Sequence, residues 1–523
     1  MKIVHFSTSD NVGAFKATYY LHRALRQEGV ESLLLVKRKT VSDDTVVQID
    51  TQRVASVRRS FFFNGKRQRA LPHAGTFHIH EETIPLVAVK KYLSGVDIIC
   101  LHWINGLLSS QGIREIHNYA RVPFVWTLMD IEPLTGGCHY SFSCDNYKRQ
   151  CRQCPHFKEP LALYRKASQY EQYGDLINAE KLFKQLLFRS GMHKNILGGV
   201  SFHLGEIQYR LENLKKAEHY YKKCRMFIPF HNKARDRLRS IVRKEIIAVN
   251  KGNYFLKILN AFGESVKSDP SYQIWQKKYK NLSSLPITFV AGSSWLFRKC
   301  KESSLFSHRA VKKILLSVND NIFKRGSKYE ARNRLHLPHE KRIIFFGARE
   351  IREYRKGFEY LLDALSVLYD QCAALCDEIL LVTAGGHLPN FNIPFQHKHL
   401  GFLKEDEMLA LAFQAADVFA CPSIEDAGPM MINQAVMCET PVVAFNTGVV
   451  PDLIFSGYNG YVAQKYSIED FAFGLKRVLE RGNNTFSVEM QDGKKRCTFQ
   501  YQAKQYIQLF EELVYDKKVR LGF

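Results

Sequence analysis

The sequence predicts an α/β protein with two parallel-sheet domains and an all-α insertion in the first of them. Two patterns carry this prediction. Across residues 1–130, and again from residue 285 onward, short apolar runs alternate with amphipathic helical stretches, which is typical of parallel sheets covered by helices on both faces. Between these regions, residues 160–250 have a helix-turn-helix rhythm instead.

The predicted domains follow these patterns, and a chain of 523 residues is long enough for three or more of them. The N-terminal domain comprises residues 1–156 and 272–325, the helical insertion 157–271, and the C-terminal domain 326–500. Residues 501–523 are expected to form a terminal helix that could pack back on the N-terminal domain. Two sheet domains in one chain predict a cleft between them in which a substrate binds.

The N-terminal domain is expected to begin with a strand, a glycine-containing loop and a helix. Its apolar strands are predicted at residues 2–7, 32–36, 97–102 and 123–129, and its first helix at about 15–28. Parallel sheets bind ligands at the carboxyl ends of their strands, where Gly13, His102 and Asp130 lie in this sequence. A glycine lets the backbone approach a ligand closely, but a lone glycine is not a dinucleotide motif. His102 could instead be a hydrogen-bonded structural residue.

The strand and helix alternation resumes after the insertion. Strands are predicted at residues 285–291, 341–348, 378–384, 416–421, 441–445 and 460–463, and helices at 357–369 and 499–515. The segment Gly292-Ser293-Ser294-Trp295-Leu296 has the pattern of a helix start that is capped by a serine. A domain boundary is expected in the polar stretch 319–334.

The inserted segment resembles tetratricopeptide repeats. Their small and aromatic positions are occupied by Leu204, Gly205, Ala217, Tyr221, Cys224 and Pro229, and in an upstream copy by Ala167, Tyr170, Ala179 and Phe183. Two copies would form a short solenoid, which must bury its exposed face on something else. Residues 157–270 contain 22 Lys and Arg against 11 Asp and Glu, which fits either solvated helix faces or a membrane- or partner-facing role.

The composition is that of a globular protein with anionic partners. The net charge is +24, from 75 Lys and Arg against 51 Asp and Glu, which favours nucleotides, phospholipid headgroups or nucleic acid. Nucleic acid is excluded from the expected partners, because no aromatic-basic binding module is recognisable. No apolar run approaches the ~18–20 residues of a membrane span. The first residues have the pattern of a strand and not of a signal peptide, so the predicted location is the cytoplasm.

Four cysteines cluster after the predicted N-terminal sheet. Cys138, Cys144, Cys151 and Cys154 lie within 17 residues and end in a C-x-x-C pair, so that four thiolates could hold a structural zinc ion. Free thiols, or a disulfide or redox pair, are the alternatives. The other cysteines are scattered, several of them in apolar runs where a buried thiol is expected.

The richest cluster of candidate functional residues lies between positions 422 and 435. A predicted strand ends at Cys421, a loop with glycine and proline follows, and an apolar helix begins near Met430. The N–H groups of the loop and the positive end of the helix make an anion site that suits a diphosphate. Glu425 can accept hydrogen bonds from sugar hydroxyls, and Asn433 lies eight residues further on. An ordinary loop with a surface glutamate is the alternative.

Basic residues occupy the strand-to-helix connection that precedes this loop in the sequence. Arg349 follows a predicted strand and Lys356 precedes a helix, so both cations could neutralise phosphate oxygens on a leaving nucleotide. Ordinary surface charge is the alternative, since Arg352 and Arg355 lie nearby. The sequence shows no set of His, Asp and Glu with metal-ligand spacing, no P-loop and no G-x-S-x-G motif.

Outside the insertion, the sequence resembles the bacterial retaining glycosyltransferases of family 4, which have the two-domain GT-B fold. The resemblance rests on Arg349 with Arg355-Lys356-Gly357, on Pro422-Ser423-x-Glu425, and on residues 440–448, 451–454 and 458–461. The N-terminal half is similar to a subgroup involved in exopolysaccharide or lipopolysaccharide assembly, through residues 101–106, 126–128, 135–140 and Cys151-x-x-Cys154-Pro155. The similarity spans roughly residues 1–156 and 272–510.

This resemblance implies a role for each matching residue. Arg349 and Lys356 would hold the donor diphosphate and Glu425 the donor sugar, with no catalytic metal. The donor-binding residues would be Gly13, Gly428, Pro429, Met430, Met431 and Asn433, while His102 and Asp130 could line the sugar or acceptor side. Three positions depart from the family, because Asn433 replaces a second glutamate, Met129 replaces a histidine, and Val12-Gly13 stands where the family has a pair of glycines in the first loop. The implied reaction is front-face substitution with retention, in which the departing diphosphate helps to deprotonate the acceptor.

Two functions of different classes follow. The first is a retaining glycosyltransferase that moves a sugar from a nucleotide-diphosphate sugar to a glycan or lipid-linked acceptor in cell-surface polysaccharide biosynthesis. The second is a catalytically degenerate relative whose tetratricopeptide-like insertion makes it a scaffold in a polysaccharide-assembly complex. Glu425, Arg349 and Lys356 favour the transferase, and Asn433 and Met129 favour the scaffold. A protein partner for the insertion, and peripheral contact with an anionic membrane on its inner face, are further expectations.

Overall fold

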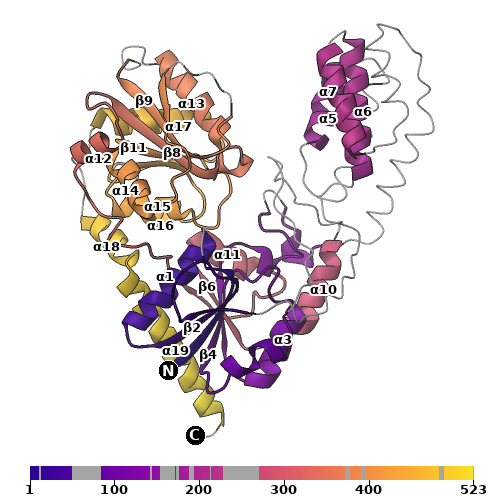
Figure 1. Ribbon diagram of the computed structural model, residues 1–523, viewed down its shortest axis with the longest axis vertical. Coiled ribbons are helices and arrows are strands. Elements are labelled where there is room, and N and C mark those ends of the chain that lie inside the picture. The colour runs from indigo at the N-terminus through magenta and orange to yellow at the C-terminus, as the bar shows by residue number, and fades with distance from the viewer. Residues whose placement is uncertain are drawn as a thin grey trace. The chain divides into compact units, whose positions relative to one another are not determined.

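The fold contains two compact units. The computed structural model describes residues 1–10, 13–49, 84–141, 144–152, 171, 176–187, 194–211, 214–227, 270–371, 377–389, 391, 393, 395–481 and 488–521. One unit comprises Met1–Ser56, His80–Leu134 and Lys277–Phe523, and the other comprises Val57–Ile79 and Thr135–Gln276. The first unit holds two parallel β-sheets with helices around each (Figure 1).

Within the described residues, the first sheet has seven parallel strands in the order β3-β2-β1-β4-β5-β6-β7. They are β1 (Lys2–Ser9), β2 (Glu31–Arg38), β3 (Val46–Gln48), β4 (Ile98–Leu101), β5 (Phe124–Leu128), β6 (Ile287–Ala291) and β7 (Val311–Lys313). Every residue of β4, β5 and β6 is buried, as expected for apolar strands covered on both faces. The apolar runs that predicted these strands are therefore the core of the sheet.

The helices that belong to this sheet begin with α1, which follows the first strand. They are α1 (Ala14–Gln27), α2 (Leu86–Val89), α3 (Ser110–Ala120), α10 (Pro270–Leu282) and α11 (Ser294–Glu302). The expected cap of α11 is confirmed, because Ser293 Oγ accepts a hydrogen bond from Leu296 N at 3.2 Å. Gly13 lies at the N-cap of α1 with φ of 58°, a left-handed conformation that favours glycine.

The C-terminal helix α19 (Phe499–Leu521) lies along α1 of the first sheet domain (Figure 1). Its apolar side joins a buried cluster with α1 that contains Tyr20, Leu21, Ala24, Phe499, Ala503, Tyr506 and Phe510. The Tyr506 hydroxyl and Thr127 Oγ1 form a buried hydrogen bond of 2.8 Å. The end of the chain therefore contributes to the core of the domain that its beginning forms.

The second sheet is also parallel, with its described strands in the order β10-β9-β8-β11-β12-β13. They are β8 (Arg342–Glu350), β9 (Ile379–Gly386), β10 (Gln396–His399), β11 (Val418–Cys421), β12 (Val442–Phe445) and β13 (Gly460–Ala463). Its helices are α12 (Lys328–Arg334), α13 (Phe358–Gln371), α14 (Asp406–Ala415), α15 (Met430–Met437), α16 (Val450–Leu453), α17 (Ile468–Arg481) and α18 (Val488–Arg496). Two parallel-sheet domains are thus present, as the sequence predicts.

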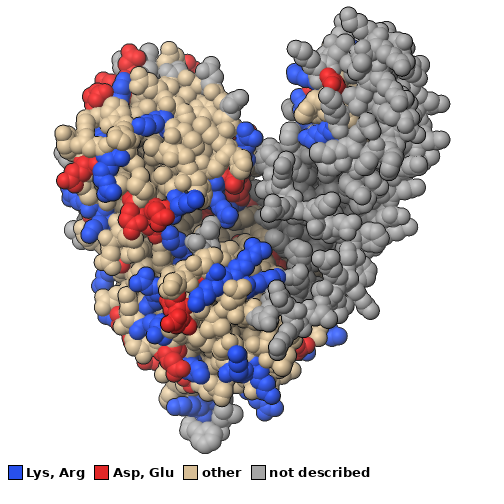
Figure 2. Space-filling view, viewed as in Figure 1, with Lys and Arg blue, Asp and Glu red and all other residues tan. Residues whose placement is uncertain are grey.

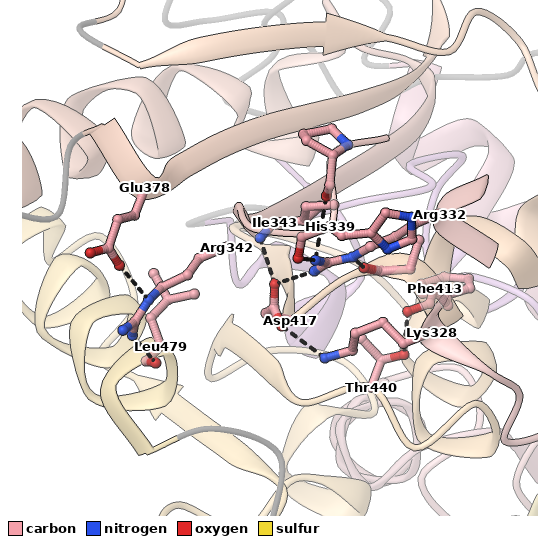
Figure 3. A network of polar contacts seen from close by, with 12 residues as sticks. Lys328, Arg332, His339, Arg342, Ile343, Glu378, Phe413, Asp417, Thr440 and Leu479 are labelled. Carbon is pink, nitrogen blue, oxygen red and sulfur yellow. Dashed lines mark hydrogen bonds and ion pairs between the residues drawn. The ribbon is translucent and has the colours of Figure 1, made fainter. Parts of the chain in front are cut away.

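Asp417 fixes three elements at the start of β11 (Figure 3). Its carboxylate accepts from Arg332 Nη2 at 2.7 Å and Lys328 Nζ at 2.8 Å, both on α12, and from the backbone N of Ile343 on β8 at 2.6 Å. The Arg332 side chain is only 5% exposed. The network therefore joins α12 and β8 to the start of β11.

In the second unit, three helices are described, namely α5 (Leu176–Leu187), α6 (Lys194–Arg210) and α7 (Leu214–Phe227). They pack in sequence order, α5 on α6 and α6 on α7. Gly205 is needed for this packing, because a Cβ there would lie 2.5 Å from the ring of Tyr221. The repeat positions Ala179, Phe183, Ala217, Tyr221 and Cys224 are fully buried. Ala167, Tyr170 and Pro229 lie outside the described residues.

Candidate functional site

Two loops meet at the carboxyl ends of the adjacent strands β8 and β11. The backbone N of Ile424, in the loop after β11, donates to the carbonyl of Arg355 at 2.9 Å. Gly357 has φ of 74°, and a Cβ there would lie 1.9 Å from the carbonyl oxygen of Pro422, so only glycine allows this approach. The structure therefore brings the segments around Lys356 and Glu425 together, although 69 positions separate the two residues in the sequence.

An ion-pair cluster connects these loops. Asp426 Oδ2 accepts from Lys356 Nζ at 2.5 Å and from Arg355 Nη1 at 2.8 Å. Burial alone would raise the pKa of the Asp426 carboxyl, but the two cations outweigh it and lower this pKa to about 2. Asp426 is therefore charged at every physiological pH. Because Asp426 directly follows Glu425 in the sequence, its bond to Lys356 brings this cation close to the segment that carries Glu425.

Glu425 is 2% exposed and has two charged or polar neighbours on a third loop, the one that follows β13. Burial lowers the pKa of Lys465, an effect that the Glu425 carboxylate and Tyr354 oppose. Burial raises the pKa of Tyr466, and Glu425 raises it further. The Lys465 Nζ lies 4.9 Å from the centre of the Tyr466 ring. Three loops of one sheet thus surround the carboxylate that the sequence assigns to the donor sugar.

Tyr466, which lies near this carboxylate, belongs to a cluster of three tyrosines. The rings of Tyr360 and Tyr466 are 6.0 Å apart, and the hydroxyls of Tyr354 and Tyr360 are 3.4 Å apart. Tyr466 is 48% exposed and has φ of 70°, a left-handed conformation that a bulky residue rarely adopts. An exposed aromatic face beside a carboxylate gives a ligand both an apolar surface and a hydrogen-bond acceptor.

The predicted diphosphate loop leads into α15 as expected. Pro429 is the N-cap residue and Met430 the first residue of the helix, so the first-turn amides of α15 have no side-chain cap. Gly428 N donates to Asp426 Oδ1 at 3.3 Å. Gly347 on β8 allows Met431 to approach, because a Cβ there would lie 2.4 Å from the Met431 methyl carbon. The segment 428–431 therefore lies next to Asp426 and the end of β8.

Asn433 is 3% exposed and is engaged within the protein. Its Nδ2 donates to the carbonyl of Leu316 at 2.7 Å and lies 3.6 Å from Cys497 Sγ. This amide therefore holds α15 to the connection that follows β7. A contact with a nucleotide ribose, which the family resemblance implies for Asn433, stays a prediction.

Among the described residues, the ion-pair cluster does not include Arg349, whose expected role in holding the donor diphosphate stays a prediction. Arg349 is exposed near the end of β8, where the pairing with β9 shifts register between Gly347 and Glu350. Among the described hydrogen bonds and ion pairs, the arginine that joins Lys356 is Arg355. Arg355 is part of the segment that carries the family resemblance, but the diphosphate role was expected of Arg349 and Lys356, so the pairing of Arg355 with Asp426 was not predicted.

The three N-terminal candidates lie at strand ends of the first sheet. Gly13 is exposed, and a Cβ there would meet nothing within 4 Å. His102 is 2% exposed and its Nε2 forms a 2.9 Å hydrogen bond with His5 Nδ1, which favours the structural alternative for this histidine. Asp130 is also 2% exposed, and its Oδ1 accepts from Glu132 N at 2.8 Å.

The predicted zinc ligands fall partly within the described residues. Cys138, Cys144 and Cys151 line one small pocket, and Gly136 N lies 3.1 Å from Cys151 Sγ. Cys154 lies outside the described residues. Within the part of the chain that the structure describes, no group of three or more His, Cys, Asp or Glu side chains could hold a metal ion. The structural zinc site stays a prediction.

Asp426, Lys465 and Tyr466 are the residues that sequence reasoning missed. Asp426 follows Glu425 directly, and a second acidic residue beside a predicted anion site was a signal that could have been used. Lys465 and Tyr466 come from a loop 40 positions further on, and nothing in the sequence connects them to Glu425. Only the parallel order of β8, β11, β12 and β13 brings their loops to the same edge.

Comparison with known proteins finds similarity in the second sheet domain. A family model described as glycosyl transferases group 1 matches residues 327–505. An uncharacterized glycosyltransferase of Methanocaldococcus jannaschii is 28% identical over 148 residues, 27% of this chain and 36% of its own length. A D-inositol 3-phosphate glycosyltransferase of Stackebrandtia nassauensis is 29% identical over 175 residues, 31% and 39% of the two chains. The chain thus spans about two fifths of the length of these curated relatives.

Solved structures match the whole chain in fold. Anabaena HepE in complex with UDP and glucose has a TM-score of 0.52 at 13% identity and covers 98% of this chain and 100% of its own. Sucrose-phosphate synthase from Thermosynechococcus elongatus has a TM-score of 0.51 at 12% identity, covering 99% and 100%. The comparisons therefore support the glycosyl transferases group 1 family for residues 327–505, on a chain whose two parallel-sheet domains have the GT-B fold.

Proposed function

We propose that this protein is a glycosyltransferase that moves a sugar from a nucleotide-diphosphate sugar to a glycan or lipid-linked acceptor. One observation carries the proposal. Loops at one edge of the second sheet hold the cations Arg355 and Lys356, the carboxylate of Glu425 and the first-turn amides of α15. These loops lie within the residues that match the glycosyl transferases group 1 model. Cations and amides suit a diphosphate, and a buried carboxylate suits sugar hydroxyls.

The chemistry follows from charge. As the bond between the sugar and the diphosphate breaks, negative charge grows on the diphosphate oxygens, and Lys356 with the helix amides would stabilise it. Glu425 would fix the sugar through its hydroxyls, so that the acceptor attacks the anomeric carbon from the face that the diphosphate leaves. Retention of configuration and independence from a catalytic metal belong to this proposal, and both come from the family resemblance.

The donor class can be narrowed for testing. HepE was solved with UDP and glucose, so UDP-glucose is the first donor to try. The resemblance of the N-terminal half to polysaccharide enzymes supports a role in cell-surface polysaccharide biosynthesis, on the cytoplasmic side. The surface carries many Lys and Arg side chains, and a peripheral contact with anionic lipid is part of the proposal (Figure 2). None of the described helices combines the length and apolar character needed to cross a membrane.

A degenerate glycosyltransferase that serves as a scaffold is the second candidate. The observation that favours it is Asn433, which stands where the family has a glutamate and whose amide is bonded to the Leu316 carbonyl. In this candidate, the stacked helices α5, α6 and α7 would bind a protein partner as tetratricopeptide repeats do.

Thermal unfolding with a panel of UDP-, GDP- and ADP-sugars separates the two candidates. A donor at 100 times its dissociation constant stabilises the folded state by ~2.7 kcal/mol, so the transferase predicts a clear rise in Tm with at least one donor. The matching free sugar is the control and should leave the Tm unchanged. If no donor raises the Tm, the transferase proposal is wrong and the scaffold is favoured.

A further inference from the structure

In the candidate donor site, the Asp426 carboxylate is bonded to the same cations and backbone N–H that could bind an anionic ligand. Its carboxylate is bonded to Lys356 Nζ, to Arg355 Nη1 and to the backbone N of Gly428. The Asp426, Lys356 and Arg355 side chains are 9%, 20% and 16% exposed, so the cluster is screened from water on most sides. An ion pair in such a place holds its geometry better than one on the open surface.

These partners are the ones that a donor diphosphate needs. A phosphate oxygen and a carboxylate oxygen accept the same short, charge-assisted hydrogen bonds from ammonium, guanidinium and backbone N–H groups. Lys356 is the cation that the family resemblance assigns to the diphosphate, and Gly428 opens the segment assigned to sugar and phosphate. An acid beside Glu425 therefore competes for the groups that bind the substrate.

We propose that Asp426 is an internal anion that occupies part of the diphosphate site, so that a nucleotide-diphosphate sugar binds by displacing the Asp426 carboxylate from Lys356. This inference rests on the proposed function, since it assigns a regulatory element to the same site. The displacement involves no covalent step. Lys356 exchanges one anionic partner for another, while Arg355, which also pairs with Glu353, can keep Asp426 in place.

The exchange has two consequences for a transferase. The affinity for the donor is lower than Lys356, Arg355 and the amides alone would give, because the carboxylate must be moved and its charge opposes the phosphate. The affinity for the released nucleoside diphosphate is lowered by the same group. Product release limits the rate of many enzymes. When the Asp426 carboxylate bonds Lys356 again, it helps to displace the nucleoside diphosphate and so speeds product release.

The test is calorimetric titration of the intact protein with UDP, GDP and ADP. The Asp426→Asn variant keeps the size of the side chain and removes its charge, and it should bind at least one nucleoside diphosphate on the order of tenfold more tightly than the wild type. Asp426→Glu keeps the charge and should stay within about threefold of the wild type, so the pair separates charge from packing. Asp426→Ser is a second neutral variant in case Asp426→Asn does not fold.

Two matched variants complete the design. Glu353→Gln removes a charge from the same arginine but leaves Lys356 bonded to Asp426, and should change affinity by less than about twofold because Glu353 is 34% exposed and screened. In a Lys356→Ala background, Asp426→Asn should increase the affinity for the nucleoside diphosphate much less than it does in the wild type. The reason is that the cation freed by removing the Asp426 charge is then absent.

Each outcome decides the proposal. Tighter nucleotide binding by the neutral variants only, with the gain in affinity lost in the Lys356→Ala background, supports it. Equal or weaker binding by folded neutral variants, with the wild type still binding nucleotide, overturns the internal anion but leaves the proposed function standing. No nucleotide binding by any variant overturns both.

Discussion

Replacing Glu425 with alanine should lower the rate of sugar transfer on the order of a hundredfold while nucleoside diphosphate binding changes by less than about threefold. The reason is the place of Glu425, which is 2% exposed and lies near Lys465 and Tyr466. A buried carboxylate that orients the sugar contributes to the transition state, whereas Lys356 and the α15 amides hold the diphosphate. Steady-state transfer and calorimetry with the nucleoside diphosphate measure the two effects separately.

The matched control for this experiment is Glu353→Ala. Glu353 is also a glutamate near Arg355, but it is 34% exposed and lies on the Arg355 side of the cluster. Its loss should change transfer by less than about threefold, because exposed ion pairs contribute little. Transfer that is unchanged in a folded Glu425→Ala variant would contradict the role assigned to this carboxylate.

Acid should destabilise the N-terminal sheet domain through three buried histidines. Burial lowers the pKa of His22 to about 4 and that of His102 to about 3, and it also lowers the pKa of His5. The unfolded chain has histidine pKa values near 6.5. Between pH 6.5 and about 4 the unfolded state therefore binds more protons, so that the free energy of unfolding is highest above pH 6.5 and falls as the pH is lowered.

The geometry explains why these histidines resist a proton. His5 and His102 share one hydrogen bond, and His22 bonds Ser32 and Thr45. Nε2 of His5 and Nδ1 of His102 have no hydrogen-bond partner among the described residues, so an added N–H would be buried without an acceptor. Around His22, Asp43 favours the charged form, while Arg26 and Arg23 oppose it.

Urea unfolding at several pH values between 8 and 5 measures this effect. Each histidine can contribute a slope of up to about 1.4 kcal/mol per pH unit to the free energy of unfolding. His102→Gln removes one such group and should flatten the pH dependence, whereas the exposed His308 replaced by glutamine should not. Equal slopes for the wild type and His102→Gln would show that His102 is protonated as easily in the folded as in the unfolded state.

The main strands could be predicted because they are apolar on both faces. Predicted strands at 123–129, 378–384 and 441–445 correspond to β5, β9 and β12 to within two residues at each end. The strands that were not predicted are β3, β7 and β10, each at the edge of its sheet. Edge strands such as β10, with the sequence Gln-His-Lys-His, need no apolar run and therefore leave no such signal.

The candidate site could be predicted only in part. Strand ends and the helix start located Glu425, Lys356 and the segment 428–431, because topology alone places such loops at one edge. The partners of these residues depend on side-chain packing between distant segments. Lys356 bonds Asp426, 70 positions away, and Asn433 bonds Leu316, 117 positions away, and no local pattern encodes either contact.

The central claim is that Lys356, Glu425 and the amides of residues 428–431 together bind one nucleotide-diphosphate sugar. The most direct measurement is a crystal structure of the protein with the donor that gives the largest rise in Tm. The account predicts diphosphate oxygens about 3 Å from Lys356 Nζ and from those amides, a sugar hydroxyl on Glu425, and Asp426 no longer bonded to Lys356. A nucleotide sugar bound elsewhere, with Lys356 still on Asp426 and Glu425 touching only protein groups, would contradict it.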